Sequence, residues 1–208
     1  NGPDVYMKKI ACGPKAKGAI SLSASVKENI YNVAKALNKN VDEITVSVLN
    51  RPRHERLVKE IRATGARIRM VNDGDILTAL STCFIGGKID LMMGIGGAPE
   101  GIIAAAGLKC LGGDFQGQFN PIGQDQMDRC LDKKVNLDKV YKIDDLIKGN
   151  DVLFAATGIT TGSFLDGVEF LEVNQATTES IVLRLPSGTT RFISSIHKLD
   201  QKLIKPNI

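Results

Sequence analysis

The sequence predicts an α/β fold, with a parallel or mixed sheet of strand–helix units, flanking helices and a C-terminal antiparallel hairpin. Short β-rich runs begin at residues 44, 66 and 89, and a helical pattern follows each of them. Strands that alternate with helices at this spacing are typical of parallel βαβ units. Further along, Pro-Ser-Gly separates two more β-rich runs, 181–185 and 190–196, and this pattern predicts a hairpin.

The first helix is predicted from its cap. Ser25 and Glu28 have the spacing of a capping box, in which two side chains satisfy free backbone N–H groups. Apolar residues then recur at helical spacing as far as Leu37, and Asn38 and Asn40 supply a stop. We therefore expect a helix that begins after Ser25 and buries one stripe of its surface.

Three strand–helix units are expected after this helix. Their strands are predicted at 44–49, 66–71 and 89–93, and the helices that follow them at 55–64, 75–84 and 99–111. Pro99 stands in the first turn of the last helix, where a backbone N–H has no helical partner in any case. Beyond residue 113 the pattern loosens, and the expected segments are a polar helix over 125–133, a short segment around 144–148 and a buried strand over 152–156.

The composition is that of a globular α/β protein, with 208 residues, 43% hydrophobic and 24% charged side chains, and no Trp. A net charge of +4 suits an anionic ligand, although scattered surface lysines explain it equally well. No basic run is interleaved with aromatic residues, so we expect no nucleic-acid partner. No apolar run approaches the ~20 residues of a membrane span. The cysteines, at 12, 83, 110 and 130, lack ligand-like spacing and are expected to be reduced side chains in the cytoplasm.

Polar residues follow each of the three predicted strands. The segments are Asn50-Arg51-Pro52-Arg53-His54 after the first, Asn72-Asp73-Gly74-Asp75 after the second, and the glycine-rich stretch from Gly94 to Glu100 after the third. The carboxyl ends of parallel strands share one edge of the sheet, where ligands of α/β proteins bind. Arginine suits phosphate, aspartate suits hydroxyl groups, and glycine allows a close backbone approach. This edge is therefore predicted to bind a phosphorylated polyol.

Each of these residues also has a simpler explanation. Arg51 and Arg53 can be solvated loop charges, and Asp73 or Asp75 can cap a helix. A carboxylate such as Glu100 is favoured in a first helical turn by the helix dipole, which, for this residue alone, is the commoner explanation. A divalent ion between Glu100 and a phosphate is the alternative, since Mg²⁺ takes carboxylate and phosphate oxygens together. The expected convergence of all these residues on one edge of the sheet favours a ligand-binding site there.

A dinucleotide site is the other hypothesis for the glycine-rich stretch. The fingerprint GxGxxG needs glycine at position 99, which is proline here, and the motif belongs after the first strand of its unit. An NAD-dependent oxidoreductase is therefore the weaker interpretation. His54 is more often a satisfied polar side chain than a catalyst, and His197, in the predicted hairpin, is interpreted as structural.

A series of motifs occurs in this order along the chain: NGPDVYMKKIACGP, VLNRPRH, NDGD, GIGGAPEG, LKCLGGD, FAATGIT, ATTES and RFISSIH. Together they resemble class II fructose-1,6-bisphosphatase, the bacterial type, which is related in fold to the lithium-sensitive phosphatases. The resemblance covers essentially the whole chain. It implies a fructose-1,6-bisphosphatase-like layered α/β fold and, in gluconeogenesis, metal-dependent hydrolysis of the 1-phosphate of fructose 1,6-bisphosphate to fructose 6-phosphate and phosphate.

The resemblance also implies roles for individual residues. Positions that contact the substrate are matched by Tyr6, Arg51, Pro52 and Arg53, at its distal phosphate, by Asp73, Gly74 and Asp75, and by Gly97. Glu100 matches a ligand of the catalytic divalent metal, Mg²⁺ or Mn²⁺. Some relatives have Lys at position 51, which implies that a single cation suffices there.

The family carries most of its metal ligands upstream, in a signature of the form Asp-Pro-Ile/Leu-Glu-Gly-Thr that this sequence lacks. We therefore expect residues 1–20 to be the tail end of a missing N-terminal metal-binding domain, and residues 21–208 to be a sugar-phosphate-binding α/β domain. The expected partners are fructose 1,6-bisphosphate, the missing N-terminal region and further copies of the chain in a homo-oligomer. This chain alone is expected to be inactive.

Two alternatives remain open. A non-catalytic sugar-phosphate-binding module is favoured by the single matched metal ligand. Within the phosphatase hypothesis, sedoheptulose 1,7-bisphosphate is a second candidate substrate.

Overall fold

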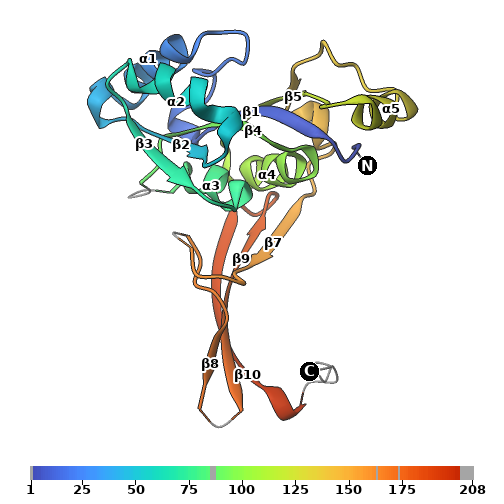
Figure 1. Ribbon diagram of the computed structural model, residues 1–208. Helices are drawn as coiled ribbons and strands as arrows, with labels where there is room; N and C mark the ends of the chain where they lie inside the picture. The colour runs from blue at the N-terminus through green and yellow to red at the C-terminus, as the bar shows by residue number, and fades with distance from the viewer. Residues whose placement is uncertain (1, 85–87, 163, 173, 202–208) are drawn as a thin grey trace. The chain divides into compact units, whose positions relative to one another are not determined.

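The computed structural model describes residues 2–84, 88–162, 164–172 and 174–201 and has the predicted α/β fold (Figure 1). The chain forms two compact units, Asn1–Asn150 and Asp151–Ile208. The first unit contains a mixed six-stranded sheet with flanking helices, and the second contains a separate antiparallel sheet.

The sheet of the first unit has the strand order β3-β2-β4-β1-β5-β6. The strands are β1 (Tyr6–Cys12), β2 (Thr45–Leu49), β3 (Arg67–Val71), β4 (Leu91–Gly97), β5 (Asp114–Phe119) and β6 (Tyr141–Lys142). As predicted, β2 runs parallel to β3 and to β4. The sheet is mixed because β1 lies antiparallel between β4 and β5, and β6 is antiparallel to β5.

Helices cover both faces of this sheet. They are α1 (Val26–Leu37), α2 (Glu55–Arg62), α3 (Asp75–Ser81), α4 (Ala98–Leu111), α5 (Gln124–Asp132) and α6 (Ile143–Leu146). Helices α1 and α2 contact each other, as do α3 and α4, and Figure 1 shows the two pairs on opposite faces of the sheet. Fully buried side chains such as Ile10, Ile30, Val46 and Ile61 fill the core under α1 and α2. This layering leaves the strand ends open for a site.

The cap of α1 confirms the predicted capping box. Ser25 Oγ accepts from the Glu28 N–H at 3.2 Å, and Glu28 Oε2 accepts from the Ser25 N–H at 2.8 Å. The helix ends at Asn38, whose left-handed backbone (φ 53°) supplies the expected stop. Both ends of α1 are thus encoded by its own sequence.

Replacing Ser25 by alanine is expected to lower the free energy of unfolding by about 1 kcal/mol, because a backbone N–H at the start of α1 loses its acceptor. Chemical denaturation measures this change. Ser23→Ala, at an exposed residue just before the cap, is the control and is expected to have little effect. Equal stability of the two variants would contradict a stabilising cap.

Three strands of the first unit were not predicted from the pattern. β1 falls within residues 1–20, and β5 and the short β6 lie where the pattern loosens after residue 113. The predicted division at residue 20 remains untested. Within the structure, β1 pairs with β4 and β5 of the same unit, and the chain divides after Asn150.

The second unit is an antiparallel sheet built around β9. Its strands are β7 (Leu153–Thr157), β8 (Glu169–Leu171), β9 (Gln175–Arg184) and β10 (Thr189–Lys198). The predicted hairpin is confirmed as β9 and β10, although β9 begins earlier than expected, and β8 was not predicted. The prediction of a buried strand over 152–156 is wrong in part, because Phe154 is the buried side chain of β7 and Leu153 is exposed. Within the hairpin, His197 Nε2 lies 2.8 Å from Thr178 Oγ1.

Within the part of the chain that the structure describes, none of the helices has both the length and the apolar surface needed to span a bilayer.

Candidate functional site

The predicted ligand edge lies where β2 and β4 diverge. The two strands pair at Val46–Leu91 and Ser47–Met92, and their chains then separate toward opposite faces of the sheet. After β2 the chain enters α2 on one face, whereas after β4 it enters α4 on the other (Figure 1). Such a switch in direction is where open α/β sheets usually bind ligands.

The glycine-rich stretch was predicted to follow the third strand, but most of it is part of that strand. Residues 94–97 are the last part of β4 and pair residue by residue with β1, so that Gly97 lies opposite Tyr6 and Gly94 opposite Lys9. The pairing with β1, which the local pattern did not reveal, extends the strand through the glycines. The carboxyl end of β4 is therefore Gly97, directly before α4.

His54 joins the two diverging strands. Its Nδ1 lies 2.7 Å from the Leu49 carbonyl oxygen, and its Nε2 accepts from the Ile95 N–H at 2.8 Å. The ring is therefore neutral, with Nδ1–H donating to Leu49. A Cβ at residue 94 would lie 3.1 Å from Nε2, so Gly94, with φ of +149°, makes room for the ring. His54 is buried and satisfied, which agrees with the non-catalytic interpretation.

The stability of the protein is expected to fall as the pH drops below about 6.5, because burial lowers the pKa of His54, assisted by the nearby charges of Arg53 and Arg51. At a pH above the pKa of His54 in the unfolded state, His54 is neutral in both states and contributes its full share to the free energy of unfolding. Below that pH the unfolded state binds a proton before the folded state does. The free energy of unfolding therefore falls as the pH drops from the unfolded pKa to the lower folded pKa.

Urea unfolding at about pH 7.5 and about pH 5.5 measures this effect. We expect a smaller loss of stability in His54→Gln than in the parent protein. His197→Gln, which removes the other histidine, is measured beside it for comparison. An unchanged slope in His54→Gln would contradict the assignment.

Arg53 and Tyr6 come together beside the end of β4. The guanidinium carbon of Arg53 lies 4.9 Å from the centre of the Tyr6 ring, and Arg53 Nε donates to the Ile95 carbonyl oxygen at 3.0 Å. Pro52 opens the short helix Pro52–His54, which turns Arg53 over the sheet. The arginine is exposed yet held from two sides, and this favours recognition of an anion by its remaining N–H groups.

Arg51 and Asp73 form an exposed ion pair across the ends of β2 and β3. Arg51 Nη2 lies 2.8 Å from Asp73 Oδ1, and Arg51 Nη1 donates to the Asn50 carbonyl oxygen at 2.9 Å. Exposed pairs of this kind add little to stability. Both side chains can therefore be recruited by a ligand at small cost.

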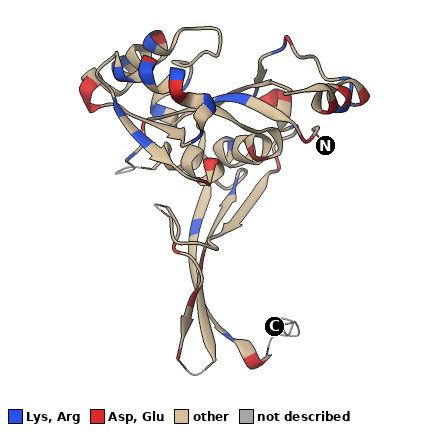
Figure 2. Ribbon diagram, viewed as in Figure 1, with Lys and Arg blue, Asp and Glu red and all other residues tan. Residues whose placement is uncertain are grey.

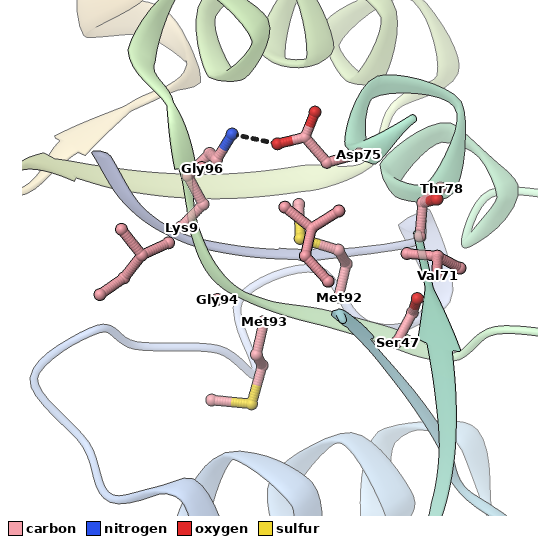
Figure 3. A pocket seen from close by; sticks show the side chains of 11 residues that line it. Lys9, Ser47, Val71, Asp75, Thr78, Met92, Met93, Gly94 and Gly96 are labelled. Carbon is pink, nitrogen blue, oxygen red and sulfur yellow. Dashed lines mark hydrogen bonds and ion pairs between the residues drawn. The ribbon is translucent and has the colours of Figure 1, made fainter. Parts of the chain in front are cut away.

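Asp75 has a different environment from Asp73. It is the first residue of α3, follows Gly74 in a left-handed conformation (φ 85°), and is only 9% exposed. Its Oδ2 is ion-paired with Lys9 (Figure 3). Lys9 was not among the site residues predicted from the sequence. The doublet Lys8-Lys9 was an available signal, since successive residues of a strand face opposite sides and one lysine of a covered strand must point inward.

Glu100 lies in the first turn of α4, and its carboxylate folds back over Gly97. A Cβ at residue 97 would lie 1.9 Å from Glu100 Oε2, so glycine leaves space for the carboxylate in this position. Because Gly97 is the cross-strand partner of Tyr6, their side-chain positions share one face of the sheet. The structure thus brings Tyr6, Arg53, Gly97 and Glu100 to one place.

Basic side chains outnumber acidic ones beside this cluster, where Glu60 is paired with Arg56. Figure 2 shows lysines and arginines on α1, α2 and β1. A cavity of about 470 Å³ on this side is lined by Lys8, Arg53, His54 and Arg56, among other residues. Its volume lies within the range of sites for small molecules.

The carboxylate of Glu100 is a possible ligand for a divalent metal ion. Among the described residues, no group of three or more His, Cys, Asp or Glu side chains is placed to hold a metal ion. Mg²⁺ is often bound by one or two carboxylates together with substrate phosphate and water, and the exposed Glu100 fits such a role. The described residues alone do not form a complete catalytic metal centre.

The mixed sheet and its two helical layers define the chain as an α/β protein. More specifically, the chain belongs to the family described as bacterial fructose-1,6-bisphosphatase, glpX-encoded, whose family model matches residues 1–197. This confirms the resemblance found in the motifs.

Relatives with a sequence similar to this chain include two cyanobacterial proteins named D-fructose 1,6-bisphosphatase class 2/sedoheptulose 1,7-bisphosphatase. The protein of Microcystis aeruginosa is 42% identical over 212 residues, which cover 96% of this chain and 61% of the relative. That of Trichodesmium erythraeum is 43% identical over 208 residues, covering 94% of this chain and 60% of the relative. The chain therefore spans about 60% of the length of these relatives.

Proposed function

We propose that the complete protein hydrolyses the 1-phosphate of fructose 1,6-bisphosphate to fructose 6-phosphate and phosphate, in gluconeogenesis in the cytoplasm. In this proposal the present chain supplies the sugar-phosphate side of the active site. One observation carries the proposal: the guanidinium group of Arg53 lies on the Tyr6 ring, at the strand end where Gly97 and Glu100 meet.

The residues of the proposed site fall into three parts, of which the first two contact the phosphate and the sugar. Arg53 and Arg51, with Tyr6 and the turn set by Pro52, hold the distal phosphate. The segment of Asp73, Gly74 and Asp75 contacts the hydroxyl groups. Asp75 would use the carboxylate oxygen that is not paired with Lys9.

The strand end forms the third part of the site. Gly97 lets the substrate approach the backbone, and Glu100 offers one carboxylate to Mg²⁺ or Mn²⁺. When bound, such an ion would polarise the phosphoryl group and acidify a bound water molecule. The remaining carboxylates would come from outside the described residues, in the same protein or in a further copy of a homo-oligomer.

A second substrate is favoured by the names of the relatives, which include sedoheptulose 1,7-bisphosphatase. Sedoheptulose 1,7-bisphosphate carries the same two phosphate groups on a longer sugar. The cavity of about 470 Å³ beside Arg53 offers space for the longer arm.

The test is phosphate release by the complete protein from each bisphosphate, with Mg²⁺ or Mn²⁺, together with calorimetric binding of fructose 6-phosphate. Turnover supports the proposal. Binding of fructose 6-phosphate without turnover would indicate a non-catalytic sugar-phosphate-binding module. Neither binding nor turnover, or tight binding of NAD instead, would contradict a sugar-phosphate site.

A further inference from the structure

A buried lysine–aspartate pair joins three elements beneath the proposed site. Lys9 comes from β1 and is 2% exposed, and Asp75 starts α3. The Lys9 ammonium group is bonded to Asp75 Oδ2 and donates to the Gly97 carbonyl oxygen, at the end of β4, at 2.9 Å. Figure 3 shows the pair above β4 at Gly96.

Neighbouring glycines make room for this pair. A Cβ at residue 96 would lie 2.6 Å from Asp75 Oδ2 and 2.9 Å from Lys9 Nζ. A Cβ at residue 101 would lie 2.8 Å from Lys9 Cδ. The backbone of β4 and the first part of α4 are thus shaped around the lysine side chain.

Stability alone is a poor explanation for the pair. Removing two charges from water is costly, and buried ion pairs can often be replaced by apolar side chains without loss of stability. What the pair does provide is a fixed geometry, because the lysine is bonded at once to a side chain of α3 and to the backbone of β4.

Both groups that Lys9 holds belong to the proposed binding edge. Asp75 is in the segment that follows β3, and Gly97 directly precedes α4 and touches Glu100. We propose that Lys9 is a positioning residue, whose ammonium group fixes Asp75 and the end of β4 relative to each other for sugar-phosphate binding. The inference rests on the proposed function. Lys9 itself does not contact the ligand in this arrangement.

The experiment measures the Kd of fructose 6-phosphate by calorimetry, on the folded complete protein, together with the thermal unfolding temperature. Lys9→Met replaces the lysine with a long unbranched side chain that has no charge. We expect a Kd about tenfold higher or more, equivalent to one lost bond to a charged group.

A control variant removes a lysine from another ion pair of the same unit. Lys39 Nζ lies 2.5 Å from Asp90 Oδ1, just before the other end of β4. Lys39→Met is expected to leave the Kd unchanged, because this pair lies at the opposite strand end from the site.

Gly96→Ala provides a second variant that keeps both charges. Its added Cβ must displace the ends of two flexible side chains, Lys9 Nζ and Asp75 Oδ2, rather than backbone atoms. We therefore expect this variant to fold and to bind fructose 6-phosphate less tightly, as Lys9→Met does, with a smaller change in unfolding temperature.

The outcomes separate the two proposals. If the parent protein binds fructose 6-phosphate and the folded Lys9→Met and Gly96→Ala variants bind it equally well, the pair is only structural and the inference is overturned. Should Lys9→Met fail to fold, Gly96→Ala decides the question. Absence of binding by the parent protein would overturn the proposed site itself, and the inference with it.

Discussion

Replacing Glu100 by alanine in the complete protein is expected to lower kcat for fructose 1,6-bisphosphate by about 100-fold or more, with little change in KM. A ligand of a catalytic ion acts on charge that develops in the transition state, and this stabilisation is worth several kcal/mol. The exposed carboxylate over Gly97 is the one that the site offers at this position. Steady-state measurement of phosphate release gives both constants.

The control is a first-turn carboxylate elsewhere in the chain. Asp125 lies in the first turn of α5, is exposed, and pairs with Arg129 at 2.8 Å. Asp125→Ala is expected to retain the parent kcat. If Glu100→Ala also retains it, Glu100 serves only the helix dipole of α4, which is the simpler explanation of its position.

Replacing Arg53 by alanine is expected to weaken binding of the distal phosphate by about 1–3 kcal/mol, the cost of losing a hydrogen bond to a charged group. This corresponds to an increase of about 5- to 150-fold in the Kd of fructose 6-phosphate or in KM, while kcat changes little. The reason is that, in the proposed function, Arg53 faces the part of the substrate that does not react. Calorimetry and steady-state kinetics measure the two quantities.

Arg62→Ala is the matched control, because Arg62 is an exposed arginine at the far end of α2. It is expected to leave the Kd unchanged. The Kd of Arg53→Lys is expected to lie between those of the parent protein and Arg53→Ala, since lysine keeps the charge but lacks the planar guanidinium group and its stacking on Tyr6. A Kd that does not respond to Arg53→Ala would show that Arg53 is only a surface charge.

The central part of the fold could be predicted because its signals are local. The Ser25 capping box, the apolar stripe of α1 and the alternation of β2, α2, β3 and α3 lie within short windows of sequence. Strand β1 could not be predicted in this way, because two adjacent lysines interrupt its apolar pattern. The burial of Lys9 depends on its ion pair with Asp75, which is 66 residues further along the chain.

Strand β5 was missed for a related reason. Its Gln116 is buried, and the side-chain amide bonds to the backbone of Leu22 and Ile20, far away in sequence. A polar residue that is satisfied only after folding looks like a loop residue beforehand. The long-range pairing of β4 with β1 likewise explains why the strand was predicted to end at residue 93, before Gly94–Gly97.

The candidate site could likewise be predicted only in part from the sequence. Its position at the strand ends followed from the order of elements, and the structure places Arg53, Gly97 and Glu100 there. The orientation of Asp75 did not follow, because it depends on Lys9, and neither did the structural role of His54 between β2 and β4. Side-chain direction at a strand end is set by contacts that the sequence pattern does not contain.

The location of β1 has a consequence for how the unit assembles. Cys12 pairs with Leu91 and Met7 with Phe119, so the partners of β1 lie roughly 80 to 110 residues further along the chain. Closing such long loops costs chain entropy and slows folding, whereas β2 and β3 are near neighbours in sequence. During synthesis, β1 cannot be paired on both sides before Phe119 has left the ribosome. Because Tyr6 and Lys9 arrive with β1, we expect the binding edge to form among the last parts of this unit.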